Sequence, residues 1–303
     1  MGTTARREEQ RSIDPFDPPK AHLLGLLFLF LTVFISPWLA GQLPDIVWFC
    51  IAAWVIISQK RASPGEIFRL NKVSPGALAF PITIALILSS AEVLVLEGAD
   101  WLTRGGFSQW AELFPSPVDQ SLPLSEVLSV CVIVPIAEEM FFRGFFSTAL
   151  RSLGTGWSVV FPAIIFALFH HPVAIGGAFI VALVAGVLTA KHDSILPAIV
   201  FHATGNAYMC LLTAVHNRFE GRASDVLYYS ITVAGVLLAI KIRPELRRLW
   251  GDARQALRDF LSRPELGTKA RLLFRHWSYI LLALENALTI VWIVATTTRA
   301  KPI

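Results

Sequence analysis

Residues 135–146 read PIAEEMFFRGFF, and this stretch decides the fold class of the chain. It belongs to an apolar run, 124–146, of the length of a membrane-spanning helix, yet it carries Glu138, Glu139 and Arg143. An ionisable side chain inside a bilayer costs at least ~2.5–3.5 kcal/mol on insertion scales, so it normally marks a site, a relay or a charge pair. Three such residues so close together indicate a functional site within a membrane.

The composition points to a membrane protein as well. Of the 303 residues, 54% are hydrophobic and only 16% are charged, which is too apolar for an ordinary soluble domain. A helix needs ~20 residues to cross the hydrocarbon core. Apolar runs near that length recur at 22–41, 44–59, 77–96, 124–146, 157–172, 173–190, 195–214, 226–242 and 278–297. Since 44–59 and 157–172 are short and 173–190 follows its neighbour with almost no loop, we predict an all-α polytopic protein with eight transmembrane helices, or nine if every run spans.

Basic residues are concentrated before the first run, after the second and after residue 242. With nine spans, the positive-inside rule places all three segments in the cytoplasm. The net charge of +4 therefore reflects topology and contact with anionic lipid, and no motif for nucleic-acid binding accompanies it. The polar, acid-containing start of the chain does not resemble a cleavable signal. Because nothing in the sequence signals a eukaryotic organelle, we expect an integral protein of the bacterial cytoplasmic membrane.

The chain divides into four parts by composition. We expect a cytoplasmic N-terminal segment (1–21), leading spans with a polar loop (22–121), a catalytic core (122–217) and C-terminal spans with a basic helix (218–303). In this last part, residues 245–263 place leucines and a tryptophan at helical spacing, with arginines on the other side. We interpret that segment as an amphipathic helix on the cytoplasmic surface that anchors to anionic lipid, with partner binding as the alternative.

The two adjacent glutamates are expected to have different roles. Residues four apart share a helix face and adjacent residues diverge by ~100°, so Glu139 can pair with Arg143 while Glu138 points elsewhere. A lone Glu138 in a desolvated cavity suits a general base that activates water. The alternative for this motif alone is a structural ion pair where the helix meets the membrane interface.

Two later helices each supply polar groups to the same region. His170 follows the turn at 152–156 by about as many residues as Glu138 precedes it, so an antiparallel hairpin would bring the two level. His202 and Asn206 are four residues apart and can both point inward, where two donors suit an oxyanion hole. Taken singly, His170 is equally readable as a structural histidine, and the His202–Asn206 pair as helix–helix hydrogen bonding.

In combination the three motifs resemble those of a known family. The motifs EExxxR, FxxxH and HxxxN, present as Glu138-Glu139…Arg143, Phe166…His170 and His202…Asn206, are similar to those of the CPBP family of intramembrane proteases. That family includes type II CAAX prenyl endopeptidases and lysostaphin-resistance-protein-A-like bacterial proteins. The resemblance covers about residues 122–217.

The resemblance implies roles for these residues. Glu138 with His170 would activate the hydrolytic water, His202 and Asn206 would stabilise the oxyanion, and Glu139 with Arg143 would brace the site. The substrate would be a membrane-associated protein or peptide. The family is described both as metal-free and as metal-dependent; we favour no cofactor, with zinc on Glu138, His170 and His202 as the alternative.

Two other functions compete with proteolysis. The chain could be a non-proteolytic membrane scaffold or immunity factor of the same fold. A transporter or proton relay also concentrates Glu and His inside membranes, and Glu285 with Asn286 in the last run would suit it. The broken, paired helices of inverted-repeat transporters are not evident in the sequence, so we rank the transporter last.

Overall fold

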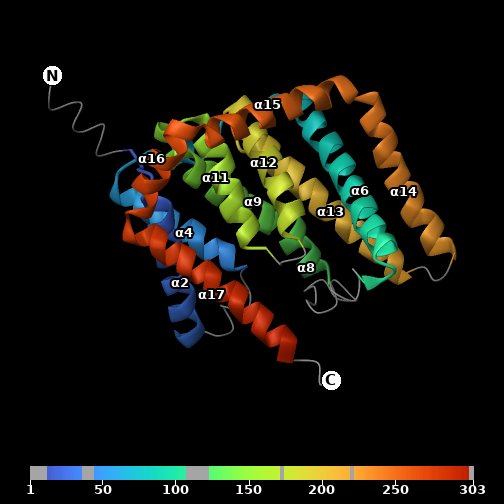
Figure 1. Cartoon of the computed structure of the whole chain (residues 1–303), viewed down its shortest axis with the longest axis horizontal. Coiled ribbons are helices and arrows are strands. Elements are labelled where there is room, and N and C mark those ends of the chain that lie inside the picture. The colour runs from blue at the N-terminus through green and yellow to red at the C-terminus, as the bar shows by residue number, and fades with distance from the viewer. Residues whose placement is uncertain (1–11, 36–43, 107–122, 171–173, 219–221, 300–303) are drawn as a thin grey trace.

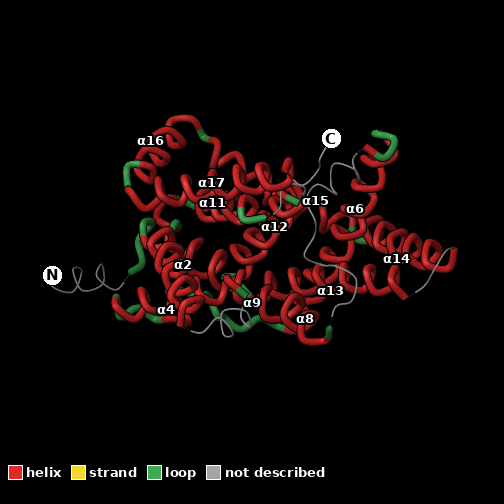
Figure 2. Tube along the Cα trace, turned by 90° about the horizontal axis from the view of Figure 1, so that it is seen from below, coloured by secondary structure: helices red, strands yellow, loops and turns green. Residues whose placement is uncertain are grey.

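The computed structural model describes residues 12–35, 44–106, 123–170, 174–218 and 222–299. Every regular element in these ranges is a helix, as the uniformly red elements of Figure 2 show. The all-α prediction is therefore confirmed for the described part of the chain. Of the predicted polar loop before the core, residues 107–122 lie outside the described ranges.

The helices follow one another in a simple order along the chain. They are α2 (Asp17–Ile35), α4 (Asp45–Gln59), α5 (Pro64–Ile67), η1 (Pro75–Leu78), α6 (Ala79–Leu102), α8 (Leu124–Leu128), η2 (Ser129–Ile133), α9 (Val134–Glu139), η3 (Met140–Phe146), α10 (Ser147–Ala149), η4 (Arg151–Leu153), α11 (Thr155–Leu168), α12 (Ile175–His192), α13 (Leu196–Arg218), α14 (Arg222–Lys241), α15 (Arg243–Leu261), α16 (Arg263–Phe274) and α17 (Trp277–Arg299). Neighbours in sequence pack as antiparallel pairs: α2 with α4, α11 with α12, and α12 with α13.

The first helix begins earlier than the apolar pattern suggests. α2 starts at Asp17, inside the segment 1–21 that we assigned to a polar cytoplasmic leader. Asp17, Pro18 and Pro19 explain this start, because an acidic residue complements the helix dipole and proline is preorganised for the first turn. The polar leader therefore contributes its last residues to a helix.

The helix that carries the two glutamates is not a regular α-helix. It runs from Leu124 to Ala149 as α8, η2, α9, η3 and α10, and both η2 and η3 are π-helical. π-helical turns are rare and frequently lie at functional sites. Pro135, which lacks a backbone N–H, lies between the two π segments in the first turn of α9.

α15 has the amphipathic pattern that we predicted, and part of its apolar stripe packs on other helices of the protein. Leu249, Ala253, Ala256 and Phe260 are buried, and α15 packs against α11 and α12. A Cβ built on Gly156 of α11 would lie 2.5 Å from the Phe260 nitrogen, so only glycine permits this approach. Figure 1 shows α15 lying across one end of the bundle. The protein's own helices therefore bury part of the apolar face, while Trp250 and Leu261 stay exposed, and the lipid anchor stays a prediction.

The predicted number of spans is not confirmed. Within the described residues, Pro75–Leu102, Ile175–His192 and Leu196–Val215 are long and apolar enough to cross a membrane. A fourth counts if Asp225–Lys241 and Arg243–Leu261, bent by 82° at their junction, form one broken span. α4 and α11, with 15 and 14 residues, are shorter than the ~20 that a straight crossing requires.

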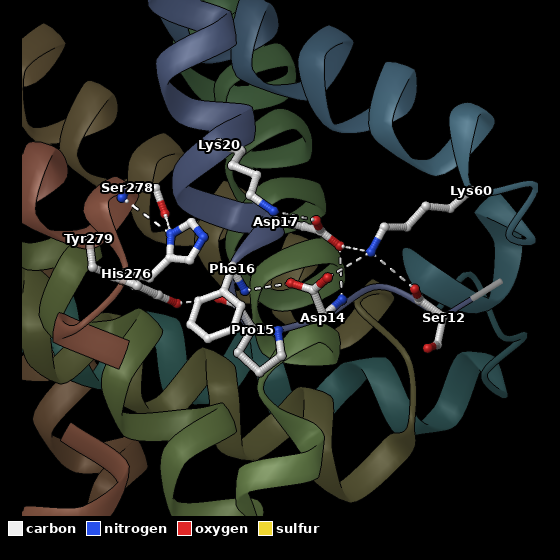
Figure 3. A network of polar contacts seen from close by, with 10 residues as sticks. All are labelled: Ser12, Asp14, Pro15, Phe16, Asp17, Lys20, Lys60, His276, Ser278 and Tyr279. Carbon is white, nitrogen blue, oxygen red and sulfur yellow. Dashed lines mark hydrogen bonds and ion pairs between the residues drawn. The ribbon is translucent and has the colours of Figure 1, made fainter. Parts of the chain in front are cut away.

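The start of α2 contacts the end of α4 and the start of α17 through polar and aromatic side chains (Figure 3). Lys60, which follows α4, reaches Asp14 Oδ2 at 2.9 Å and Asp17 Oδ2 at 2.5 Å. Phe16 stacks on His276 with ring centroids 4.4 Å apart, and the Tyr279 hydroxyl donates to the Pro15 carbonyl at 2.5 Å. The start of α2 is thereby fixed to α4 and α17.

Candidate active site

Glu138 and Glu139 are the last two residues of α9, where the helix widens into the π-helical η3. Their side chains leave the helix in different directions, as expected for adjacent residues. Glu139 is completely buried, whereas the Glu138 side chain keeps 17% of its surface accessible. The two carboxylates therefore occupy different surroundings although they are neighbours in sequence.

Glu139 is the centre of a buried polar cluster. Arg143 Nη1 donates to Glu139 Oε1 at 2.9 Å, so the structure contains the ion pair that the i, i+4 spacing suggested. His202 Nδ1 approaches the same oxygen at 2.9 Å. Because a carboxylate oxygen accepts, the proton of this bond lies on His202 Nδ1. Glu139 thus links the helix of the glutamates to α13.

Phe166 holds three members of the site together. The Arg143 guanidinium lies over its ring, 4.5 Å from the centroid, in a desolvated cation–π contact. The His170 ring lies 4.4 Å from Phe166 and the His202 ring 6.0 Å from it, centroid to centroid. The first residue of the FxxxH motif is therefore a packing platform between the charged pair and both histidines.

His170 lies just after the C-terminus of α11, and one hydrogen bond fixes its tautomer. Nδ1 is 2.8 Å from the carbonyl oxygen of Phe166. A carbonyl can only accept, so Nδ1 carries the proton and Nε2 of the neutral ring keeps a lone pair. His170 can therefore accept a proton or a hydrogen bond through Nε2.

Glu138 lies close to the far side of His202. Glu138 Oε2 is 3.6 Å from His202 Nε2, and this carboxylate oxygen is buried without a hydrogen-bond partner among the described residues. His202 consequently lies between the two glutamates, with Nδ1 bonded to Glu139 and Nε2 facing Glu138.

Asn206, one turn after His202, is oriented by the broken helix. Its Nδ2 donates to the carbonyl of Val130 at 2.8 Å, within the π-helical η2. Nearby, the thiols of Cys131 and Cys210 lie 3.7 Å apart, sulfur to sulfur. These contacts hold α13 against the helix that carries Glu138.

Two cavities meet at His170 and Phe166. The first, about 170 Å³, is lined by His170, His202 and Asn206, with α6 and α12 forming its other walls. The second, about 370 Å³, is lined by Glu138 and His170 together with residues of α2, α4 and α17. Glu138 and the His202–Asn206 pair therefore lie on different cavities that share the same histidine.

The cavities also expose titratable residues outside the three motifs. Glu92 of α6 lines the first cavity. His22 and Glu285 line the second, and His22 Nε2 is 2.9 Å from Glu285 Oε2. The sequence carried a signal for Glu92, an ionisable residue in the apolar run 77–96, but only the fold shows that it faces the site. Asn286, the neighbour of Glu285, instead donates to the Leu282 carbonyl of its own helix at 2.8 Å.

The described residues do not form a metal site. No group of three or more His, Cys, Asp or Glu side chains in these ranges is arranged to hold a metal ion. Glu138, His170 and His202, which we considered as zinc ligands, therefore lie near one another without the geometry of a ligand set.

Carboxylates and histidines grouped in a cavity between apolar helices are typical of an integral membrane protein that performs acid–base chemistry. Residues 120–208 match the protein-family model described as type II CAAX prenyl endopeptidase Rce1-like, which confirms the predicted family for this domain. The activity in the description of that family is hydrolysis of a peptide bond by an endopeptidase. The matched segment contains all seven motif residues. A search of the curated proteins found no match, and neither did a search of the solved structures.

Proposed function

We propose that this protein is an intramembrane endopeptidase that hydrolyses a peptide bond of a membrane-associated protein or peptide. One observation carries the proposal: the Glu138 carboxylate lies 3.6 Å from His202 in a cluster whose cavities also expose His170 and Asn206. A general base, a second proton acceptor and two donors in one place are the groups that peptide hydrolysis requires. The family match of the same segment points to the same reaction.

Glu138 and His170 are suited to activate water. Both line the larger cavity, and His170 Nε2 is free to accept a hydrogen bond because Nδ1 is bonded to Phe166. In the proposed step the water oxygen attacks the scissile carbonyl carbon while Glu138 takes one of the water protons. That proton then passes to the departing amine nitrogen as the C–N bond breaks, which restores the carboxylate.

His202 and Asn206 are suited to stabilise the tetrahedral intermediate. Asn206 uses one N–H for the Val130 carbonyl and retains a second for the oxyanion. His202 donates through Nδ1 to Glu139, so donation to the oxyanion requires a proton on Nε2 as well. In this proposal Glu139 and Arg143 orient His202 and do not touch the substrate. The proposed step uses no metal, and zinc held by Glu138, His170 and His202 is the alternative.

We extend the proposal to the membrane arrangement. Eight of the nine apolar runs, or all nine, would span the bilayer of the bacterial cytoplasmic membrane, with α15 on the cytoplasmic side. The exposed arginines of α15, which include Arg247, Arg254 and Arg258, would contact anionic headgroups while its apolar face stays on the protein. The substrate would be a bacterial membrane or exported peptide. It would take the place of the CAAX proteins that the family description names.

A comparison of protein termini tests the proposed activity. Membrane-protein termini are identified by mass spectrometry in host cells that carry the wild-type protein, the Glu138→Gln variant or the control Glu126→Gln, which changes a glutamate near the start of the same helix. New termini present with wild type and Glu126→Gln but absent with Glu138→Gln would support proteolysis and identify the substrate. Identical termini, with Glu138→Gln still complementing a deletion, would instead support the scaffold.

A further inference from the structure

Glu92 is a charged residue of the first cavity that the three motifs do not include. It lies in the middle of α6, whose helix Pro75–Leu102 is long and apolar enough to span a membrane. It lines the same cavity as His170, His202 and Asn206. It also lies outside the matched segment 120–208, so the family comparison gives it no role.

The carboxylate of Glu92 is packed against the start of α12. A Cβ built on Gly177 would lie 2.6 Å from Glu92 Oε1, so a larger residue at position 177 would displace the carboxylate. Among the described residues no hydrogen bond or ion pair satisfies this carboxylate. A carboxylate inside a membrane helix usually has a partner, and such a residue is by default a candidate for function.

The other polar groups of this cavity do not compensate a negative charge with a fixed cation. They are the imidazoles of His170 and His202, the amide of Asn206 and the hydroxyl of Ser89. The nearest arginine of the site, Arg143, is buried against Glu139 and Phe166. A cationic group that entered the cavity would therefore find Glu92 as its carboxylate partner.

We propose that Glu92 determines substrate specificity by pairing with a lysine or arginine side chain next to the scissile bond. A cation in an apolar cavity is stabilised by a desolvated carboxylate, whereas a neutral side chain leaves that carboxylate unpaired and an acidic one is repelled. The cavity, about 170 Å³, is several times the ~30 Å³ of one water, so it admits one side chain rather than a folded segment. The proposal rests on the proposed endopeptidase function and names its substrate class.

The same charge disfavours one kind of substrate. A chain end bound with its terminal carboxylate in this cavity would lie beside the Glu92 carboxylate, and two like charges brought together repel each other. The cavity therefore favours a basic side chain over a free carboxyl terminus.

Matched peptides test this assignment on the purified full-length protein in lipid nanodiscs. A pool of peptides with apolar flanks is first screened for cleavage that the Glu138→Gln variant lacks. A cleaved peptide is then synthesised with Lys, Gln or Glu at each position around the cleaved bond. We expect at least a tenfold higher kcat/KM for Lys than for Gln at one position, a preference that Glu92→Gln abolishes and that Glu92→Lys reverses in favour of Glu.

The control is Glu97→Gln, which changes an exposed glutamate on the same helix that does not line the cavity. It should keep the wild-type preference. A preference for Lys that persists in Glu92→Gln would overturn the proposal. So would a uniform loss of kcat for all three peptides, which indicates a catalytic or structural role for Glu92. If the wild-type protein shows no cleavage that depends on Glu138, the proposed endopeptidase function fails. If it cleaves peptides but shows no preference for Lys, only the role of Glu92 fails.

Discussion

At the scale of single residues, Glu139 accepts two hydrogen bonds on one buried oxygen, from Arg143 and from His202. Glu138, its neighbour in sequence, is partly accessible instead, so the two adjacent carboxylates can have different roles. One is neutralised by fixed partners, and the other faces a cavity. The separation follows from the ~100° rotation between neighbouring helical residues.

Removing either member of the Glu139–Arg143 pair should destabilise the fold. Glu139→Leu leaves Arg143 and His202 without their carboxylate, and Arg143→Met leaves Glu139 as a buried charge, each at a cost of about 3–5 kcal/mol. The double variant should lose less than the sum of both, because no lone charge remains. Thermal unfolding of the four proteins in detergent measures this coupling. Strictly additive losses would show that the pair does not act as a unit.

Asp193 makes a second, more exposed charge cluster at the end of α12. Its carboxylate accepts from Arg69 at 2.9 Å and also from Arg151. Partial burial alone would raise the pKa of Asp193, but the hydrogen bonds from Arg69 and Arg151 outweigh it and lower the pKa below 3.8. The stabilisation is therefore present above the pKa of the unfolded chain, ~3.9, and is lost as the pH falls through the folded value.

Asp193→Asn should remove this acid-sensitive contribution with little disturbance of the backbone. Residue 193 has a φ of 46°, which asparagine tolerates well. Since the side chain is 61% exposed, solvent screening limits the loss at pH 7 to about 1 kcal/mol or less. The difference in melting temperature between wild type and variant should shrink from pH 7 to pH 3. A difference that is constant with pH would contradict the charge assignment.

At the scale of elements, the site depends on how α13 packs against the broken helix 124–149. Asn206 donates a hydrogen bond to the Val130 carbonyl. Cys131 is the next residue after Val130, and Cys210 lies one helical turn after Asn206; their two sulfur atoms are 3.7 Å apart. The π-helical η2 contains both Val130 and Cys131, so it presents the Val130 carbonyl and the Cys131 thiol to α13.

The contact between the two thiols predicts a cross-link across the site. Treatment of membranes with iodine, a two-electron oxidant, should join Cys131 and Cys210 as a disulfide with release of two protons and reduction of iodine to iodide. Peptide mass spectrometry detects the linked pair. Cys50, whose thiol instead lies 3.1 Å from the Ala137 carbonyl, is the internal control and should remain free. A cross-link to Cys50 in place of this pair would contradict the packing of α13.

At the scale of the whole molecule, positive charge gathers at the end of the bundle that α15 covers. A surface pocket there is lined by residues from α11, α12 and α15, among them Lys191 and Arg248 as well as Asp252 and Asp259. Three further basic residues lie near the ends of helices on this side. Arg69 and Arg151 contact Asp193, and Lys60 contacts Asp14. The opposite end, where α8 begins, has fewer basic residues in the described part of the chain, among them Arg104, Arg218 and Arg222.

This asymmetry predicts the orientation in the membrane, with α15 in the cytoplasm. Ser125→Cys, at the start of α8, and Gln255→Cys, on α15, are compared in a protein whose three native cysteines are replaced. A membrane-impermeant maleimide should label Ser125→Cys in intact cells and Gln255→Cys only after permeabilisation. The reverse labelling pattern would invert the topology.

The sequence alone determined the fold class, the family and the candidate catalytic residues, because these depend on local patterns. Apolar runs with few charges can form only helices in a bilayer, and the spacing of Glu139 and Arg143 places them on one face in any helix. The apolar stripe of α15 was also visible, but periodicity does not distinguish a face buried in lipid from one buried in protein.

Only the tertiary structure decided what each pattern contacts. Three such contacts join segments far apart in the chain. α15 covers α11 and α12, Phe166 supports Arg143 and both histidines, and Glu92 faces the site from α6. They follow from the packing of whole helices, where a glycine such as Gly156 or Gly177 sets how closely two helices approach. A local pattern carries no information on its partner, because the partner is selected by shape and charge complementarity in three dimensions.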